Sequence, residues 1–243
     1  MIRLFDEKFS QKHSKKIKRL IDFFWIIVYL CTFKIIKIMI SKEENILFNA
    51  EKLFAEKGFD GTSIREISKE AQVNVSMISY YFVSKEKLFE KIFEYRMNES
   101  LSFAKDVLAY QKMNEWEKFI AVINRYIIRV KTLKTFYLIM QREQLTNKNE
   151  HIVKFLNESK MGFLEIYRQL IASGIQNKVF TKAPRLEFIH STISGTIFSA
   201  LNSLPIYKSF YKGDEEYENL YFEDLNNHIK NVLKYLLGYE ENI

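Results

Sequence analysis

The sequence has few residues that cross-link a chain or interrupt a helix: one Cys, two Pro and seven Gly among 243 residues. With Cys31 alone, an intramolecular disulfide and a cysteine-based zinc site are excluded, and a reducing, cytoplasmic compartment is expected. The scarcity of Pro and Gly favours long helices with few tight turns. Because 47% of the residues are hydrophobic, the chain can form a packed core and is not a disordered tail.

Motifs of the common enzyme classes are also missing. The sequence has no nucleophile elbow, phosphate-binding loop or zinc signature, and its four His residues lack metal-ligand spacing. We therefore expect a protein that is not an enzyme and that uses no metal or cofactor.

The positive charge is concentrated at the N-terminal end. Residues 1–40 contain nine Lys or Arg and three Asp or Glu, so they account for all but one unit of the net charge of +7. The bulk charge of the remaining chain therefore gives no support for nucleic-acid binding, which has to be argued from motifs.

Residues 1–40 also contain an apolar run, whose uncharged part, Phe23 to Phe33, is 11 residues long. A membrane span needs about 20 apolar residues. Three interpretations are open: a membrane anchor, an extra helix packed on the body, or spurious translation upstream of a true start at Met39. The clean helical pattern that follows Met39 favours the third. We expect a cytoplasmic protein, or a membrane-associated one if residues 20–40 are translated and inserted.

Residues 41–97 read as four short-linked helices. Ser41 and Glu44 have the spacing of a capping box, in which each residue satisfies a free backbone N–H of a helix N-terminus. Gly58 suits the left-handed position that ends this first helix. Ser63 and Glu66 form a second capping box. Asn74 and Ser84 are candidate N-caps of two further helices.

Two short helices, Ile64 to Ala71 and Val75 to Phe82, are separated by only three residues. This arrangement is typical of a helix-turn-helix, whose second helix enters the major groove of DNA. The expected inward residues are Ile64, Ile67, Ala71, Val73, Ile78 and Phe82. The expected outward residues are Val75, Ser76, Met77, Ser79, Tyr80 and Tyr81. A three-helix bundle with a polar surface is the structural alternative.

Residues 42–88, KEENILFNAEKLFAEKGFDGTSIREISKEAQVNVSMISYYFVSKEKL, resemble the DNA-binding domain of the TetR family of bacterial repressors. The resemblance implies an all-α homodimer, with a helix-turn-helix domain that binds a palindromic DNA operator and a larger helical domain that binds a small-molecule effector and mediates dimerisation. It also implies a set of DNA contacts: Thr62, Ser63, Arg65, Asn74, Val75, Ser76, Met77, Ser79, Tyr80, Tyr81 and Lys85.

The sequence departs from the family pattern at two positions. Gln72 stands where the family usually has Gly, so we expect a positive φ at a residue with a side chain, at a cost of about 1 kcal/mol. Ser79 replaces the family's usual Tyr in the recognition helix. The phosphate contact of that Tyr is expected to pass to Tyr80 or Tyr81.

Residues 98–243 are expected to form the helical ligand-binding and dimerisation domain. Long helical patterns cover 115–142, 151–174, 186–204 and 221–237. The last two helices are candidates for a four-helix dimer interface, through small residues on one and an apolar stripe on the other: Ser191, Gly195, Ser199, Leu225, Ile229, Val232 and Leu236. The alternative is that both stripes pack within one subunit.

Candidate ligand-binding residues are aromatic or flexible side chains of the segment 115–142: Trp116, Tyr126, Tyr137 and Met140. Aromatic residues at helical spacing line a core more often than a pocket. His190, among apolar neighbours, is expected to be a hydrogen-bonded interior group. The sequence thus predicts a ligand-responsive transcriptional regulator, a repressor. A DNA-binding sensor tethered to the membrane by residues 1–40 is the alternative, and an enzyme on a borrowed helical fold is a third.

Overall fold

The computed structural model describes residues 41–213 and 215–240, and the three interpretations of residues 1–40 lie outside this part of the chain. The described residues form nine α-helices and no strand, so the all-α expectation is confirmed. None of these helices is long and apolar enough to cross a bilayer. Residues 47–243 form one compact unit, and 41–46 are the described part of a second.

Helix α2 (Lys42–Lys57) begins and ends at the predicted signals. The Glu44 backbone N–H donates to Ser41 Oγ at 3.1 Å, and Glu44 Oε2 accepts from the Ser41 N–H at 3.0 Å. Beyond Lys57, Gly58 adopts a φ of +76°, which an L-residue with a side chain rarely adopts.

Helices α3 (Ile64–Glu70) and α4 (Val75–Phe82) pack against each other. The second capping box, Ser63 with Glu66, is present. Gln72 has the predicted positive φ, at 55°. Asn74 has the extended backbone of an N-cap, but its side chain makes no capping hydrogen bond.

Helix α5 (Lys85–Ala109) follows the N-cap Ser84 and runs for 25 residues. The predicted domain boundary between 97 and 98 falls inside this helix and stays a prediction.

One predicted helix, 115–142, is two helices: α6 (Glu115–Thr132) and α7 (Lys134–Thr146). The break is at Leu133, whose φ and ψ are −119° and 38°. Just before it, the Thr132 hydroxyl donates to the carbonyls of Ile128 and Arg129, and such back-bonding competes with the helical N–H groups for the carbonyls.

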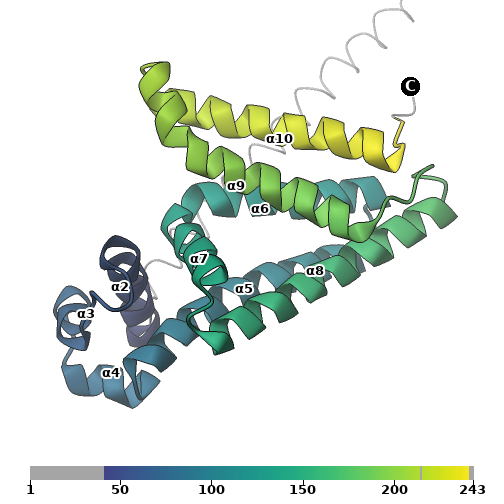
Figure 1. The fold of residues 1–243 in the computed structure, drawn as a ribbon. Helices are drawn as coiled ribbons and strands as arrows, with labels where there is room; N and C mark the ends of the chain where they lie inside the picture. Colours follow the sequence, from purple (N-terminus) through teal and green to yellow (C-terminus); the bar gives the residue numbers. More distant parts are fainter. Residues whose placement is uncertain (1–40, 214, 241–243) are drawn as a thin grey trace, which may run out of the picture. The chain divides into compact units, whose positions relative to one another are not determined.

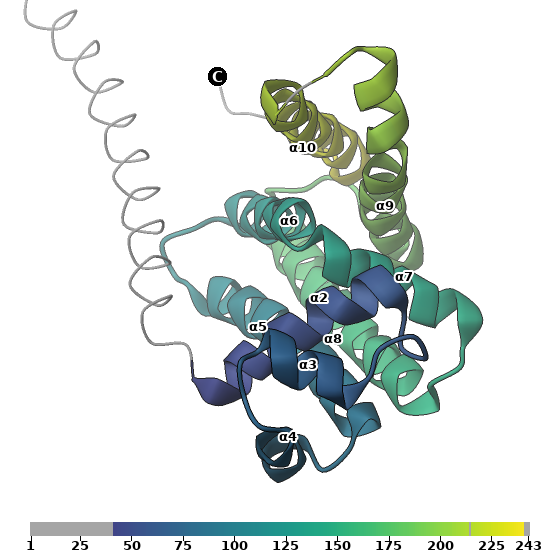
Figure 2. The same cartoon turned by 90° about the vertical axis from the view of Figure 1, so that its left-hand side faces the viewer.

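Three long helices complete the chain: α8 (Glu150–Gln176), α9 (Leu186–Phe210) and α10 (Glu215–Leu237). Helix α9 continues through Pro205, past its predicted end. In Figure 1, α5 and α8 run side by side, and α9 and α10 form a second pair. Helix α6 contacts all four of these helices and lies between the two pairs (Figure 2).

Candidate functional site

The first candidate site is the outward face of α4. Ile78 and Phe82 are buried, whereas Val75, Ser76, Ser79, Tyr80 and Tyr81 are exposed; these five residues are called the α4 face below. Tyr80 is 81% exposed and Tyr81 37%. Their rings meet edge-to-face at 5.1 Å. The predicted orientation of the helix therefore holds for these seven side chains, whereas Met77, which was expected outward, is half-buried.

The N-terminal end of α3 supplies polar groups next to the α4 face. The N-cap Ser63 and the following Arg65 are both exposed, and the Arg65 guanidinium forms no ion pair with a described residue. Lys57 donates to Glu66 at 2.7 Å, and this bond, together with those from Ser63, lowers the pKa of Glu66 to about 2. The charge of Lys57 is thus compensated by Glu66, whereas Arg65, without an ion-pair partner among the described residues, is available to a phosphate or a base.

Thr62 does not present its side chain to DNA. Only 2% of the residue is exposed, and its hydroxyl donates to the carbonyls of Leu53 at 3.2 Å and Gly58 at 2.8 Å. The expected side-chain contact of Thr62 is therefore corrected: the hydroxyl joins the end of α2 to the turn before α3.

Lys85 is only partly available. Its ammonium group donates to the carbonyls of Phe59 and Thr62, each at 3.0 Å, and lies 4.2 Å from the centre of the Phe59 ring. Two of the three ammonium donors are used within the protein, which leaves one for a phosphate.

The second candidate site is a cavity of about 370 Å³ between α5, α6, α7, α8 and α9. Its apolar part is formed by Met97, Phe103, Val122, Met140, Leu156, Phe163 and Phe198. Its polar part is formed by Ser100, Arg125, Tyr126, Arg129, Tyr137, Gln144, Lys160, Tyr167, His190, Ser191 and Ser194. Gly195 completes the lining. This volume and mixed lining are typical of small-molecule sites.

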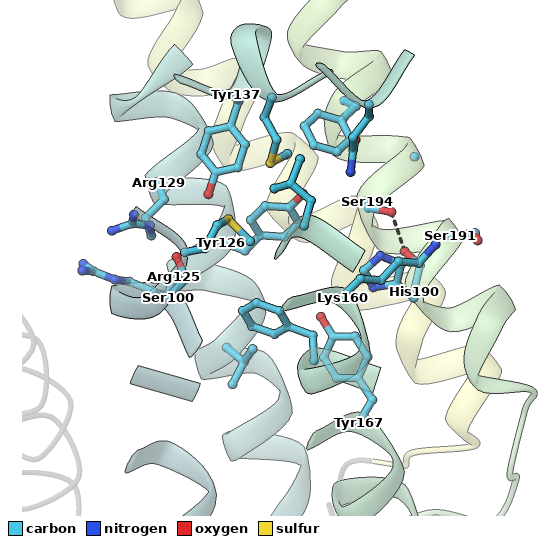
Figure 3. Close-up of a pocket in the computed structure, with 18 of the residues that line it drawn as sticks. Ser100, Arg125, Tyr126, Arg129, Tyr137, Lys160, Tyr167, His190, Ser191 and Ser194 are labelled. Carbon is cyan, nitrogen blue, oxygen red and sulfur yellow. Dashed lines mark hydrogen bonds between the residues drawn. The ribbon is translucent and has the colours of Figure 1, made fainter. Parts of the chain in front are cut away.

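Polar groups lie on two sides of the cavity. Figure 3 shows Arg125 and Arg129 on one side and Lys160, His190 and Ser191 on the other. Both arginines pair with Glu99 of α5, with nitrogen–oxygen distances of 2.7 Å.

Burial sets the protonation of the other polar groups. Desolvation raises the pKa of Tyr126 and of Tyr137, so both hydroxyls are protonated donors at neutral pH. Burial, with a smaller contribution from Lys160, lowers the pKa of His190 to about 4. His190 is therefore a neutral imidazole, and no protein group within the described residues bonds its Nδ1.

Three of the four predicted ligand residues, Tyr126, Tyr137 and Met140, line this cavity. Trp116 does not line it: its ring stacks on Tyr239 at 4.3 Å, so the structure does not bring Trp116 to this cavity. Sequence reasoning missed Arg125 and Arg129, although two cations four residues apart, among the apolar residues in the middle of helix α6, were a usable signal.

The predicted dimer residues divide into two groups. On α9, Ser191, Gly195 and Ser199 are exposed. On α10, Leu225 and Ile229 are buried within this chain, where α10 packs on α9 and α6, and Val232 and Leu236 are partly buried. Leu225 and Ile229 therefore pack in the core of their own chain and not at an interface, while an interface role for Val232 and Leu236 stays a prediction.

No group of metal-binding side chains occurs within 41–213 and 215–240.

Residues 46–92 match the family model described as bacterial regulatory proteins, tetR family. The chain is 26% identical over 200 residues to the probable HTH-type transcriptional regulator YttP of Bacillus subtilis, covering 80% of this chain and 95% of that protein. Over 52 residues, 21% of this chain and 24% of the relative, it is 50% identical to the HTH-type transcriptional repressor NicS of Pseudomonas putida.

Among solved structures, the transcriptional regulator FadR of Bacillus subtilis in complex with stearoyl-CoA has a similar fold. Its TM-score is 0.61 at 21% identity, covering 81% of this chain and 98% of that one. The likeness to FadR shows a shared fold, and the family-model match together with the likeness to YttP places the chain in the tetR family of bacterial regulatory proteins, as a DNA-binding transcriptional regulator.

Proposed function

We propose that the chain is a ligand-responsive repressor that binds a palindromic operator as a homodimer and releases it when an effector enters the cavity. The observation that carries the proposal is that the α4 face and the cavity belong to one compact unit and are joined by α5. Relatives named as repressors, such as NicS, support the direction of control.

A continuous set of polar contacts leads from the cavity to the helix-turn-helix. Arg129 donates from Nη2 to the Arg96 carbonyl at 2.9 Å and pairs with Glu99, one α5 turn further on. The Arg96 side chain makes two hydrogen bonds to Glu51 of α2, at 2.8 and 3.3 Å. Helix α2 is tied in turn to α3, through Lys57 with Glu66. An effector that moves Arg129 thus has a physical route to the DNA-binding helices.

DNA contact is proposed for the α4 face, together with Ser63, Asn74, Met77 and Arg65, and for the remaining donor of Lys85. For dimerisation we retain the exposed side of α9 around Ser191, Gly195 and Ser199. A two-fold dimer places two recognition helices about 34 Å apart, one helical turn of DNA, as a palindrome requires.

The deciding experiment maps the DNA bound by the protein in its host and measures binding to the recovered site by fluorescence anisotropy. Tyr81→Phe should weaken binding of the specific duplex by about 1 kcal/mol, the net value of one hydrogen bond. Arg65→Ala should weaken binding of both the specific and a scrambled duplex and reduce the salt slope by about one unit. Tyr235→Phe, an exposed tyrosine on α10, is the matched control.

Equal affinity for the recovered and scrambled duplexes would refute sequence-specific regulation. A lower folding stability of Tyr81→Phe with unchanged DNA affinity would show instead that this tyrosine is structural.

A further inference from the structure

The cavity wall carries charge of one sign. Among its lining residues, Arg125, Arg129 and Lys160 are cationic, and none is acidic. We infer that the effector is an apolar organic acid, with its hydrophobic body in the cavity and its acidic group at Lys160. This inference rests on the proposed function, because it names the class of ligand for the same cavity.

Lys160 is the cation in this wall that has no carboxylate partner. Glu99 bridges Arg125 and Arg129, and so compensates much of the charge on that side. Around Lys160, no acidic side chain of the described residues lies within ion-pair distance. An anion there gains an attraction that a neutral ligand lacks, and a cation is repelled.

Groups beside Lys160 suit an acidic head group. The ring of His190 lies 6.3 Å from that of Tyr167. The imidazole is neutral and can donate its N–H in a hydrogen bond to the acidic group. Ser191 lines the cavity on the same side (Figure 3). Ser194 instead donates to the His190 carbonyl at 2.8 Å, which fixes this turn of α9 (Figure 3).

The remaining lining is suited to a hydrocarbon or aromatic body. Phe163, Phe198 and Met140 are among the apolar side chains that line the cavity. Burial of each CH₂ group of a ligand here contributes about 0.8 kcal/mol. At about 370 Å³, the cavity lies at the small end of ligand sites, which fits a single small acid.

The test compares three probes of equal chain length, decanoate, 1-decanol and decylamine, below their micelle concentrations and by isothermal titration calorimetry on the full chain. We expect decanoate to bind about fivefold more tightly than decanol, the upper value of a solvent-exposed ion pair, with decylamine weakest. Lys160→Met should remove this preference, so that decanoate and decanol bind equally tightly. Lys154→Met, an exposed lysine on α8 outside the cavity, is the matched control.

Each other outcome contradicts the inference in a distinguishable way. Decanol or decylamine binding as tightly as decanoate would overturn the acid class while leaving the cavity as a ligand site. A preference for decanoate that survives Lys160→Met would overturn the placement of the head group. If no probe binds, the inference fails, while the operator measurements decide separately whether the chain is a regulator.

Discussion

Val83 follows the recognition helix in a backbone conformation that favours glycine. Its φ is 66° and its ψ −50°, and the Ser84 N–H donates to the Phe82 carbonyl at 2.7 Å, which together define a strained γ-turn. A β-branched residue is a genuine outlier there. Because 81% of Val83 is exposed, its side chain contributes little packing in return.

We expect Val83→Gly to raise the free energy of unfolding by about 1 kcal/mol, since glycine has no Cβ to clash with the backbone. Urea denaturation measures this change. Val75→Gly, also exposed but inside the first turn of α4, is the control and should lower stability by a similar amount. A loss of stability in both variants would show that Val83 is not strained.

Lys85 should prove to be a structural residue as well as a DNA contact. Lys85→Met removes two hydrogen bonds from a charged donor and should lower the free energy of unfolding by about 1–2 kcal/mol. Lys87→Met on the same helix breaks only the pair of an exposed lysine with Glu90 and should change stability by less than about 0.5 kcal/mol. Equal stability of the two variants would leave phosphate binding as the sole role of Lys85.

His190 should make stability depend on pH. Its pKa is about 4 in the folded protein against 6.5 for the ordinary side chain. Burial is the main cause of this lowering, and the positive charge of Lys160 is the smaller one. The unfolded chain therefore binds the extra proton first, so stability is complete above pH 6.5 and falls as the pH drops towards 4. Over this range we expect a loss of about 1–3 kcal/mol, and a flatter denaturation profile for His190→Asn. Identical profiles for both proteins would contradict the shift.

At the level of secondary structure, helix boundaries could be predicted from the sequence where local capping interactions set them. The boundaries of α2 and α3 follow from capping boxes, and the positive φ of Gln72 follows from the turn it occupies. The break at Leu133 and the passage of α9 through Pro205 were not predictable, because tertiary packing decides them.

The amphipathic patterns predicted which side chains are buried, but not which surface they pack against. The stripe of α10 was correctly recognised as apolar, yet its pattern is the same whether it packs on its own chain or on a second copy. Likewise, Trp116 and Tyr126 are aromatic residues of the same helix, and only the three-dimensional fold directs Tyr126 to the cavity and Trp116 to Tyr239.

The exposed side of α9 gives a direct test of dimerisation. A Cβ at Gly195 would meet nothing within 4 Å in this chain, so Gly195→Leu should leave the subunit folded. If α9 forms the dimer seam, sedimentation velocity should show a monomer that binds the operator more weakly. Gly195→Ala is the control and should remain dimeric. A dimer that tolerates leucine would place the seam elsewhere.

For the molecule as a whole, the pair of Glu51 and Arg96 connects its two functional ends. The pair is largely buried, with side-chain exposures of 7% and 12%. Glu51→Gln leaves Arg96 without its counter-charge and should lower the free energy of unfolding by about 3 kcal/mol. Glu94→Gln, which breaks an exposed pair with Lys91, should have an effect below about 0.5 kcal/mol. If both variants change the free energy of unfolding by the same small amount, the buried pair does not stabilise the fold.

Helix α5 begins directly after the γ-turn at Val83, and Ser100 of the same helix lines the cavity. At about 1.5 Å per residue, the helix between Lys85 and Ser100 is a stiff rod of about 22 Å. A tilt of about 5° pivoted at the cavity would displace its far end by about 2 Å, as much as separates a hydrogen bond from no bond. Mechanically, α5 is a lever, so a small tilt that an effector imposes at the cavity end would displace the α4 face from a DNA groove without unfolding any helix.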